Sequence, residues 1–321
     1  MGTQPDTALS GAVELTSVMQ HIVKFSGGMG SWMAARRVAS AEGTADLRLL
    51  FTDTLAEDSD LYRFLIEAAA EVFGERLPAQ LVQGARQIPE FHEDRFGRRQ
   101  HIRALRADMA EVLPGLVWIE EGRDPWEVFR DERMLGNSRF DPCSRVLKRQ
   151  IADRWLTEHC DPTDTRIYIG IDWTETHRFD DGQGGGAKHR WAERGWQADA
   201  PLIRAPFPNK NEMMTAARAA GIEPPALNVA GYSHNNCGGF CCRAGQGHFA
   251  HRLRVHPERY AHDEALEEEQ RANLGKDVSM LSDRAGDNIK KPLTLRTLRE
   301  RIEAGGQVDM YDIGGCGCFV D

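Results

Sequence analysis

The sequence predicts an α/β fold built on a doubly wound, mostly parallel sheet. Short β-prone runs alternate with segments of helical periodicity, which is typical of parallel sheets with helices on both faces. The candidate functional motifs follow directly after predicted strands, and ligands of such sheets bind beyond the carboxyl ends of the strands. Hydrophobic residues make up 41% of the 321 residues, which is enough for a sizeable core.

The first half of the predicted domain contains two strands and two helices. A β-prone run over 21–25 ends in a glycine-rich turn, and apolar residues recur on one face of the next segment, 31–41. A second apolar run over 47–51 predicts the next strand. The spacing of apolar residues then predicts a helix over 58–73, which Asp58 can cap.

The second half repeats this alternation with longer connections. Its predicted elements are a strand over 116–119, a helix over 144–157, a strand over 166–171, a strand over 202–207 and a helix over 211–220. The proline in the last of these strands favours an edge position, because proline has no N–H to donate to a neighbouring strand. A glycine directly after the last helix is expected to end it.

The chain is expected to comprise a tail, one α/β domain and an extension. We place the N-terminal tail at 1–19, the domain at 20–255, and a helical, cysteine-containing extension that packs back on the core at 256–321. The polar stretch 87–100 predicts an inserted loop. The glycine-rich stretch 180–188 predicts a flexible loop that can act as a lid.

Charge and composition argue against several classes of protein. The net charge of −9 disfavours strong non-specific binding of nucleic acid by the whole surface. The sequence has no run of about 18 apolar residues and no basic start followed by an apolar run, so it predicts neither a membrane span nor a signal peptide. The expected location is the cytoplasm. There the seven cysteines, an odd and clustered set, suggest metal or redox chemistry more than disulfides.

A glycine-rich loop joins the first predicted strand to the first helix. The residues expected to bind phosphate there are Ser26, Gly27, Gly28, Gly30 and Ser31. Glycine lets the backbone approach an anion closely because it has no Cβ, and the N–H groups at a helix start carry partial positive charge. No Gly-Lys-Ser/Thr follows, so this is not a Walker-type loop. The alternative interpretation is an ordinary glycine-rich turn.

The pattern Ser-Gly-Gly-x-x-Ser after a strand resembles the PP-loop of ATP pyrophosphatases and of PAPS (phosphoadenosine phosphosulfate) reductases. The resemblance covers roughly residues 20–250. It implies an adenine nucleotide α-hydrolase-like, Rossmann-like fold that binds ATP or PAPS together with Mg²⁺. In the pyrophosphatase members a substrate oxygen attacks the α-phosphate of ATP, pyrophosphate leaves, and a sulfur or nitrogen nucleophile then displaces AMP.

Two further elements resemble nucleotide-contacting parts of this superfamily. Thr52 and Asp53 end the second strand, where the family places the adenosine or Mg²⁺; the alternative is that this segment caps the next helix. Glu175 and Arg178 follow the fourth strand in an element that resembles the family's Gly-hydrophobic-Arg/Asp-x-x-Glu-Ser/Thr pattern. The resemblance implies a Mg²⁺ contact for Glu175 and a phosphate contact for Arg178, although many relatives have arginine where this chain has Asp172. The alternative is a capped loop whose charges face solvent.

A basic segment at the start of the third predicted helix resembles the Cys-x-x-x-x-Lys element of the PAPS reductase-like branch. Cys143 and Lys148 match it, and Arg145 lies between them. Both basic residues are expected to supply charge to phosphates or to an acidic substrate. Cys143 is expected to have a lowered pKa and to act as a nucleophile, a sulfur carrier or a cluster ligand. With Asp53, Cys143 and Lys148 form the expected catalytic set; the alternative is an inert cysteine with a surface lysine.

The cysteines nearer the C-terminus predict a metal site or a redox pair. The expected ligands are Cys237, Cys241, Cys316 and Cys318, with the last two supplied by a tail that folds back. The first two lie in a segment that resembles the Gly-Tyr/Phe-x-His-Asn-x-Cys element of the same branch. Thiolates of this kind suit a [4Fe–4S] cluster or Zn²⁺. His234 and His248 are alternative ligands, and Cys242 can replace its neighbour.

The resemblance implies an ATP pyrophosphatase-type enzyme that adenylates a second substrate for sulfur or nitrogen insertion, with a sulfur donor as a partner. One alternative is a PAPS reductase-like oxidoreductase that works with a thioredoxin-like protein; the chain ends Gly-Gly-Cys-Gly-Cys-Phe-Val-Asp where those enzymes carry Glu-Cys-Gly-Leu-His. Another is an ATP pyrophosphatase of the DNA phosphorothioation type with an Fe–S cluster, although the acidic charge does not favour DNA binding by this chain alone. A module that binds nucleotide without turnover is the last alternative.

Overall fold

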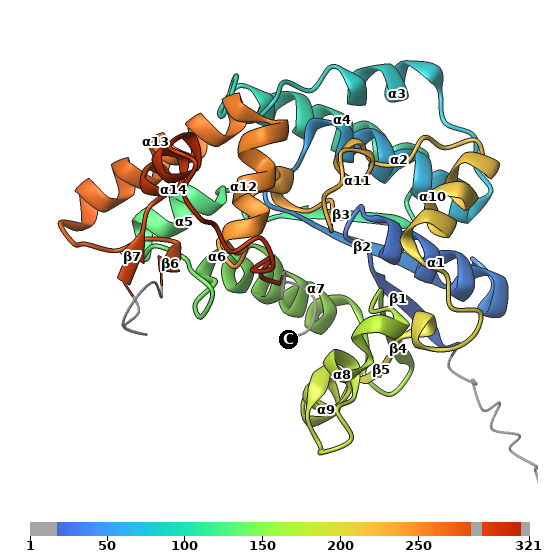
Figure 1. The fold of residues 1–321 in the computed structure, drawn as a ribbon. Helices are drawn as coiled ribbons and strands as arrows, with labels where there is room; N and C mark the ends of the chain where they lie inside the picture. Colours follow the sequence, from blue (N-terminus) through green and yellow to red (C-terminus); the bar gives the residue numbers. More distant parts are fainter. Residues whose placement is uncertain (1–17, 284–290, 316–321) are drawn as a thin grey trace, which may run out of the picture.

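The computed structural model describes residues 18–283 and 291–315, and a five-stranded sheet forms its centre (Figure 1). The strands are β1 (Gln20–Lys24), β2 (Leu47–Asp53), β3 (Leu116–Glu120), β4 (Thr165–Ile169) and β5 (Gln197–Asp199). They lie in the order β3-β2-β1-β4-β5, and every neighbouring pair is parallel. The chain therefore winds outward from β1 in both directions, as a doubly wound sheet does.

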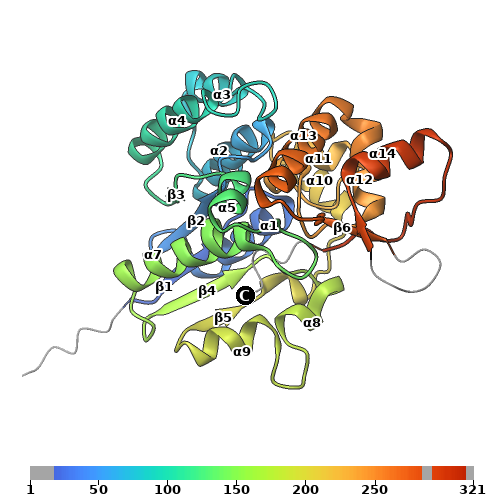
Figure 2. The ribbon, with the colours of Figure 1, turned by 90° about the vertical axis from the view of Figure 1, so that its left-hand side faces the viewer.

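Helices cover both faces of the sheet, so the predicted fold class is confirmed at this level (Figures 1 and 2). One face packs against α1 (Met29–Glu42), α2 (Ser59–Phe73), α3 (Ala79–Arg86), α4 (Arg98–Val112) and α10 (Lys210–Ala219). The other face packs against α7 (Ile151–His159), α8 (Thr176–Phe179) and α9 (Gly186–Glu193). Neighbouring strand residues serve opposite faces: Val23 belongs to the first core and Ile22 to the second.

A third hydrophobic core joins α5 (Pro125–Asp131) to the C-terminal part of the chain. The elements there are α12 (Gln246–Val255), α13 (Pro257–Leu274), the antiparallel pair β6 (Leu281–Asp283) and β7 (Lys291–Leu293), and α14 (Leu295–Glu303). Phe129 of α5, Phe249 of α12 and Tyr260 of α13 are fully buried in this core. Figures 1 and 2 both show these helices beside α5.

Shorter elements connect these layers. They are α6 (Pro142–Ser144), the π-helical turn η1 (Arg145–Gln150), the 3₁₀ turns η2 (Trp173–Glu175), η3 (Pro201–Ile203) and η4 (Cys237–Gly239), and α11 (Ala226–Val229). Together α6, η1 and α7 occupy the region predicted as one helix over 144–157. No helix in the described ranges combines the length and the apolar character that crossing a membrane requires.

The predicted strand over 202–207 is wrong, because the fifth strand of the sheet is β5 and the chain then enters η3. Arg37 of α1 explains the difference, since its guanidinium donates to the carbonyl oxygens of Pro201 at 2.8 Å and Arg204 at 2.9 Å. These carbonyls therefore bond a side chain and not a neighbouring strand. Pro201, directly before this stretch, and Pro206 within it also have no N–H for a ladder.

The predicted loop over 87–100 is wrong at its end, because α4 already begins at Arg98. The charged composition suggested an exposed segment, but the Arg98 side chain is fully buried. Its guanidinium donates to the carbonyl oxygen of Glu57 at 2.8 Å and lies over the ring of Tyr62, 5.7 Å from its centroid. Arg98, although charged, therefore makes its contacts in the interior of the protein.

Candidate functional site

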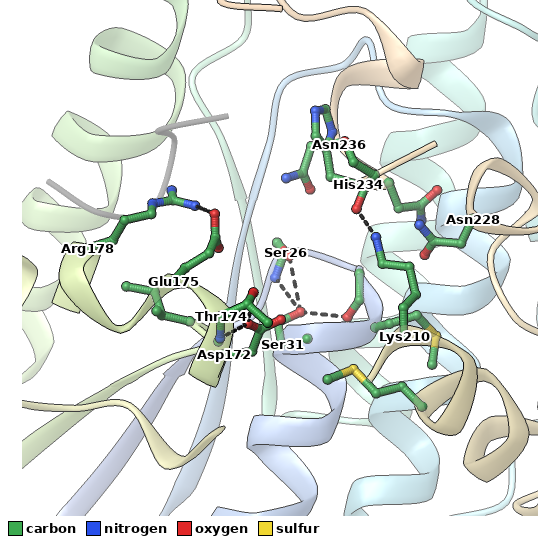
Figure 3. Close-up of a pocket in the computed structure, with 18 of the residues that line it drawn as sticks. Ser26, Ser31, Asp172, Thr174, Glu175, Arg178, Lys210, Asn228, His234 and Asn236 are labelled. Atoms are coloured by element: carbon green, nitrogen blue, oxygen red, sulfur yellow. Dashed lines mark hydrogen bonds and ion pairs between the residues drawn. The ribbon is translucent and has the colours of Figure 1, made fainter. Parts of the chain in front are cut away.

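A cavity of about 510 Å³ opens at the carboxyl ends of β1 and β4 (Figure 3). Most of its described lining residues come from the glycine-rich loop, the chain after β4, the start of α10, the segment 233–236 and the C-terminal stretch 313–315. The strand order reverses between β1 and β4, and doubly wound sheets bind their ligands at such a point. The volume is that of a small-molecule site.

The glycine-rich loop forms the floor of the cavity and is held in shape by its own two serines. The backbone N–H of Ser26 donates to Ser31 Oγ at 3.1 Å, and Ser31 Oγ donates to the carbonyl oxygen of Gly28 at 2.9 Å (Figure 3). Gly27 has a φ of +70°, and a Cβ there would lie 3.0 Å from the Leu61 side chain. The loop therefore requires glycine at this position.

The start of α1 offers unsatisfied N–H groups to the cavity. No side chain caps this helix, and its first turn contains no acidic residue. The first N–H groups of a helix have no partner within the helix and carry partial positive charge. Because Gly28, Met29, Gly30 and Ser31 all line the cavity, these groups are available to an anion.

Two glycines pack the loop against the end of β4. A Cβ on Gly170 would lie 2.8 Å from the backbone nitrogen of Ser31 and 2.9 Å from its Cα. A Cβ on Gly30 would lie 3.0 Å from the carbonyl oxygen of Gly170. The loop and the end of β4 are thus closer together than any side chain at these two positions would permit. This contact fixes the floor of the cavity relative to the wall formed after β4.

The predicted residues Glu175 and Arg178 do lie at the cavity, on the wall formed after β4 (Figure 3). They form an ion pair with each other. On the opposite wall Lys210 donates to the carbonyl oxygen of Ser233. Burial lowers the pKa of Lys210, while the charges of Asp172 and Glu175 raise it. The cavity therefore has a cationic side chain on each of two facing walls.

Sequence reasoning did not assign Lys24, His234 or Asn235 to a nucleotide site, although all three line the cavity. Asn235 is 2% exposed and donates to the carbonyl oxygen of Gly27 at 3.0 Å, so it braces the loop from above. Burial lowers the pKa of His234 to about 3, and its imidazole is neutral at pH 7. Burial also lowers the pKa of Lys24 to about 8. The sequence does carry one signal for Lys24: it is a lysine within a β-prone run whose other residues mostly belong to the core.

Lys148, for which the sequence predicts a phosphate contact, is not among the described residues that line the cavity. Its Nζ is 3.4 Å from Glu57 Oε1, and the two side chains are only 3% and 1% exposed. Glu57 also accepts from Thr54 Oγ1 at 3.0 Å and from the backbone N–H of Cys237. The pair therefore joins η1 to the chain after β2 and to the cysteine-rich segment, and it acts as a structural connection.

Arg145 and Thr52 are likewise not among the described residues that line the cavity. Arg145 faces outward and pairs with Glu132 at 2.7 Å. Thr52 is 2% exposed within β2. The stretch 180–188, expected as a lid, contributes no residue to the described wall either.

Asp53 is fully buried beside β3 and does not face the cavity. Its carboxylate accepts from the backbone N–H of Leu55 at 2.7 Å, from Tyr62 Oη at 3.0 Å and from Trp118 Nε1 at 3.0 Å. Burial, with the charge of Glu57, raises the pKa of Asp53 to about 6, against these hydrogen bonds. The structure thus corrects the predicted ligand contact, because the carboxylate serves three neighbouring donors.

Asp53→Asn is expected to change how stability depends on pH. The folded pKa of about 6 lies above the ordinary value of 3.8, so the folded state holds the proton more tightly. Asp53 therefore contributes stability that is present below about pH 4 and is lost as the pH rises through about 6. The free energy of unfolding of the wild type should fall relative to that of the variant between these values, as measured by urea titration. A constant difference would contradict the assignment. Burial raises the pKa of Glu267 to about 7. Its contribution cancels in the difference between the two unfolding free energies, because both proteins contain it.

A second, smaller pocket gathers cysteines from two distant parts of the chain. The thiols that line it belong to Cys143, Cys237, Cys241 and Cys242. The sulfur atoms of Cys143 and Cys242 are 3.8 Å apart. This contact is the largest cause of a lowered Cys143 pKa, and the charge of Lys148 adds to it while burial opposes it. Cys143 therefore lies in a thiol cluster beside Lys148, and not at the nucleotide-type cavity.

The predicted metal site is not assembled by the residues that the structure describes. Within 18–283 and 291–315, no three His, Cys, Asp or Glu side chains are grouped to hold a metal ion. Cys316 and Cys318 lie outside the described residues. The alternative ligand His248 donates through Nε2 to the carbonyl oxygen of Gly239 at 2.7 Å. A ligand role for Cys237 and Cys241 stays a prediction.

Cys143 and Cys242 are expected to form a disulfide when the protein is incubated with glutathione disulfide, which is reduced as the two thiols are oxidised. The sulfur atoms lie 3.8 Å apart and a disulfide bond is about 2.05 Å long, so only a small approach of the two sulfur atoms closes the bond. Alkylation followed by peptide mass mapping would show the linked pair. Cys143→Ser should abolish the linked pair, whereas Cys160→Ser should not. If Cys143 and Cys242 can both still be alkylated after oxidation, the expectation is wrong.

Comparison with known proteins gives no match to any protein-family model and none among curated proteins. The functional argument therefore rests on the geometry of the cavity and on the sequence motifs that line it.

Proposed function

We propose that the chain is a PP-loop enzyme of the ATP pyrophosphatase type, which adenylates a substrate with release of pyrophosphate. One observation carries the proposal: the Ser26–Ser31 loop and the uncapped start of α1 form the floor of an open cavity at the switch point of the sheet. An anion there meets backbone N–H groups and not acidic side chains. A polyphosphate is the ligand whose charge and size suit such a floor.

The cationic side chains on the walls support the same conclusion. Lys210 and Arg178 face each other across the cavity (Figure 3). When a substrate oxygen attacks the α-phosphorus, the bond to the bridging oxygen breaks and negative charge develops on the departing pyrophosphate. Cations and N–H groups already in position stabilise that charge without having to reorganise. The adenylated substrate then accepts a sulfur or nitrogen nucleophile and AMP leaves.

Magnesium fits the wall after β4. Mg²⁺ is usually held by one or two carboxylates together with substrate phosphates, and Asp172 and Glu175 are the carboxylates that line the cavity. Bound there, the ion would neutralise charge on the polyphosphate. Asp172 is also tied to its own turn, because its Oδ1 accepts from the backbone N–H of Thr174 at 2.8 Å. A cysteine-held Fe–S cluster or Zn²⁺ stays a prediction, because two of its four expected ligands, Cys316 and Cys318, lie outside the described residues.

The binding of Mg-ATP tests the proposal. Ser31→Ala removes the hydroxyl that holds Ser26 and Gly28 in the loop, and neutral hydrogen bonds are worth about 0.5–1.5 kcal/mol each. We expect a loss of affinity of about tenfold by calorimetry, with a parallel loss of pyrophosphate release. Thr215→Ala, on α10 and outside the described wall of the cavity, is the control. If the wild type does not bind Mg-ATP at millimolar concentration, the proposed function is wrong.

A PAPS reductase-like thiol chemistry is the second candidate, and one observation favours it. The C-terminal stretch runs along the cavity, where Ile313, Gly314 and Gly315 line the wall. The backbone N–H of Gly245 holds this stretch through the carbonyl oxygen of Ile313 at 3.1 Å. The sequence then continues into Cys316. Sulfite release from PAPS with thioredoxin would support this candidate, and pyrophosphate release from ATP would support the first.

A further inference from the structure

We propose that Trp173 and Phe207 form the platform on which the base of the bound nucleotide stacks. This inference rests on the proposed function and adds to it the part of the site that holds the nucleoside. The phosphate loop is proposed to bind the phosphates of the ligand, and it leaves the base without an assigned contact. The structure places Trp173 on the wall of the same cavity, with the ring of Phe207 beside it, and no contact described so far gives this aromatic pair a role.

The two rings are exposed although they lie next to each other. Trp173 is 42% exposed and Phe207 is 53% exposed. Their centroids are 6.0 Å apart with an interplanar angle of 58°. Of the described residues that line the cavity, Trp173 is the one phenylalanine, tyrosine or tryptophan. A large aromatic surface therefore faces both solvent and the ligand cavity, where a π-face is available for stacking.

The position of Trp173 relative to the phosphate loop is fixed by the local structure. It lies three positions after Gly170, which packs against the backbone of Ser31, so the chain between them spans at most about 10 Å. Asp172 braces the turn, because its Oδ1 accepts from both the backbone N–H and the hydroxyl of Thr174, at 2.8 and 2.6 Å. The indole thus stands at a set distance from the phosphate floor, as the base stands from the phosphates of a nucleotide.

The second ring comes from the chain that leads into the opposite wall. Phe207 directly precedes Pro208, Asn209 and Lys210, all of which line the cavity. Asn209 caps α10 through its side chain, which accepts from the backbone N–H of Glu212 at 3.0 Å. The aromatic pair therefore joins the two walls at the rim. A base that stacks here would close the cavity above the phosphates.

The charges around the pair favour a single nucleotide over a nucleic-acid strand. Lys188 pairs with Asp180 at 2.8 Å, and Arg204 pairs with Asp199 at 2.7 Å. A strand needs a continuous row of cations for its phosphates, and these two cations each have an acidic partner. Stacking also tolerates every base, because every base has a π-face. Trp173 therefore adds affinity for nucleotides in general and does not by itself select adenine.

The test separates the base from the phosphates by comparing Mg-ATP with magnesium tripolyphosphate, which has no base. Trp173→Ala should weaken Mg-ATP binding by about 5- to 150-fold, since stacking contributes about that much per base, and should leave tripolyphosphate affinity unchanged. Trp173→Phe should retain most of the affinity. Phe140→Ala removes a ring that is also exposed, at 58%, but lies outside the described wall of the cavity, and should have no effect.

The outcomes distinguish this inference from the proposed function. If both ligands bind the wild type and Trp173→Ala binds Mg-ATP equally well, the platform is wrong and the phosphate site stands. If Trp173→Ala loses affinity for Mg-ATP and for tripolyphosphate to the same degree, Trp173 maintains the structure of the cavity wall and does not stack on the base. That result also overturns the inference. If neither ligand binds the wild type, the proposed function fails and the inference fails with it.

Discussion

Replacing Lys148 by methionine is expected to lower the free energy of unfolding by about 3–5 kcal/mol. The Lys148 and Glu57 side chains are 3% and 1% exposed, with Nζ and Oε1 3.4 Å apart. Removing one partner of a buried pair leaves the other charge without compensation in a medium of low dielectric constant. The hydrogen bonds of Glu57 with Thr54 and Cys237 do not replace the missing cation.

Urea denaturation of Lys148→Met, Glu57→Gln and the double variant would measure this effect. The double variant should recover part of the loss, because it no longer contains an unpaired charge. Arg145→Met is the matched control: it removes another basic residue of η1, whose ion pair with Glu132 is 45% and 36% exposed, and exposed pairs contribute about 0–1 kcal/mol. If Lys148→Met lost nucleotide affinity while its stability stayed unchanged, Lys148 would be the phosphate contact that the sequence predicts.

The misplacement of Lys148 shows where motif reasoning fails. The pattern Cys-x-x-x-x-Lys was interpreted on an α-helix, but residues 145–150 form a π-helical turn. A π-turn closes its hydrogen bonds at i→i+5 and so changes the direction of the side chains that follow. Lys148 consequently lines the thiol pocket together with Cys143. A single sequence carries no clear signal for such a turn.

The glycine-rich loop could be predicted because its chemistry is local. Ser26, Gly28 and Ser31 form hydrogen bonds within six residues, and the strand and helix on either side follow from periodicity. Asp53 could not be interpreted in the same way, because its burial depends on Tyr62 of α2 and Trp118 of β3. The pairing of β1 with β4 and the approach of Gly170 to the loop likewise join segments far apart in the chain. Local pattern thus predicts the elements and the loop, whereas the walls of the cavity arise from long-range packing.

That long-range packing makes Gly170→Ala the most direct test of the phosphate site. A Cβ at Gly170 would lie 2.8 Å from the backbone nitrogen of Ser31 and 2.9 Å from its Cα, and separations this short force a backbone to shift. The backbone that must move carries the N–H groups proposed to bind phosphate. Because displacing a binding group by about 1 Å can cost about 100-fold in activity, we expect a loss of Mg-ATP affinity of about that size.

The affinity of Gly170→Ala for tripolyphosphate should fall to the same degree, because the substitution displaces the groups that bind phosphate and not those that bind the base. This parallel loss is the opposite of the result expected for Trp173→Ala, so the two variants together locate the two ends of the ligand. Gly84→Ala is the matched control: Gly84 lies within α3 with nothing within 4 Å of an added Cβ, and alanine favours a helix. Far-ultraviolet circular dichroism and thermal melting would confirm that both variants are folded. If folded Gly170→Ala binds both ligands as tightly as the wild type, phosphate does not bind at this loop, because the close contact between Gly170 and Ser31 can be displaced without consequence.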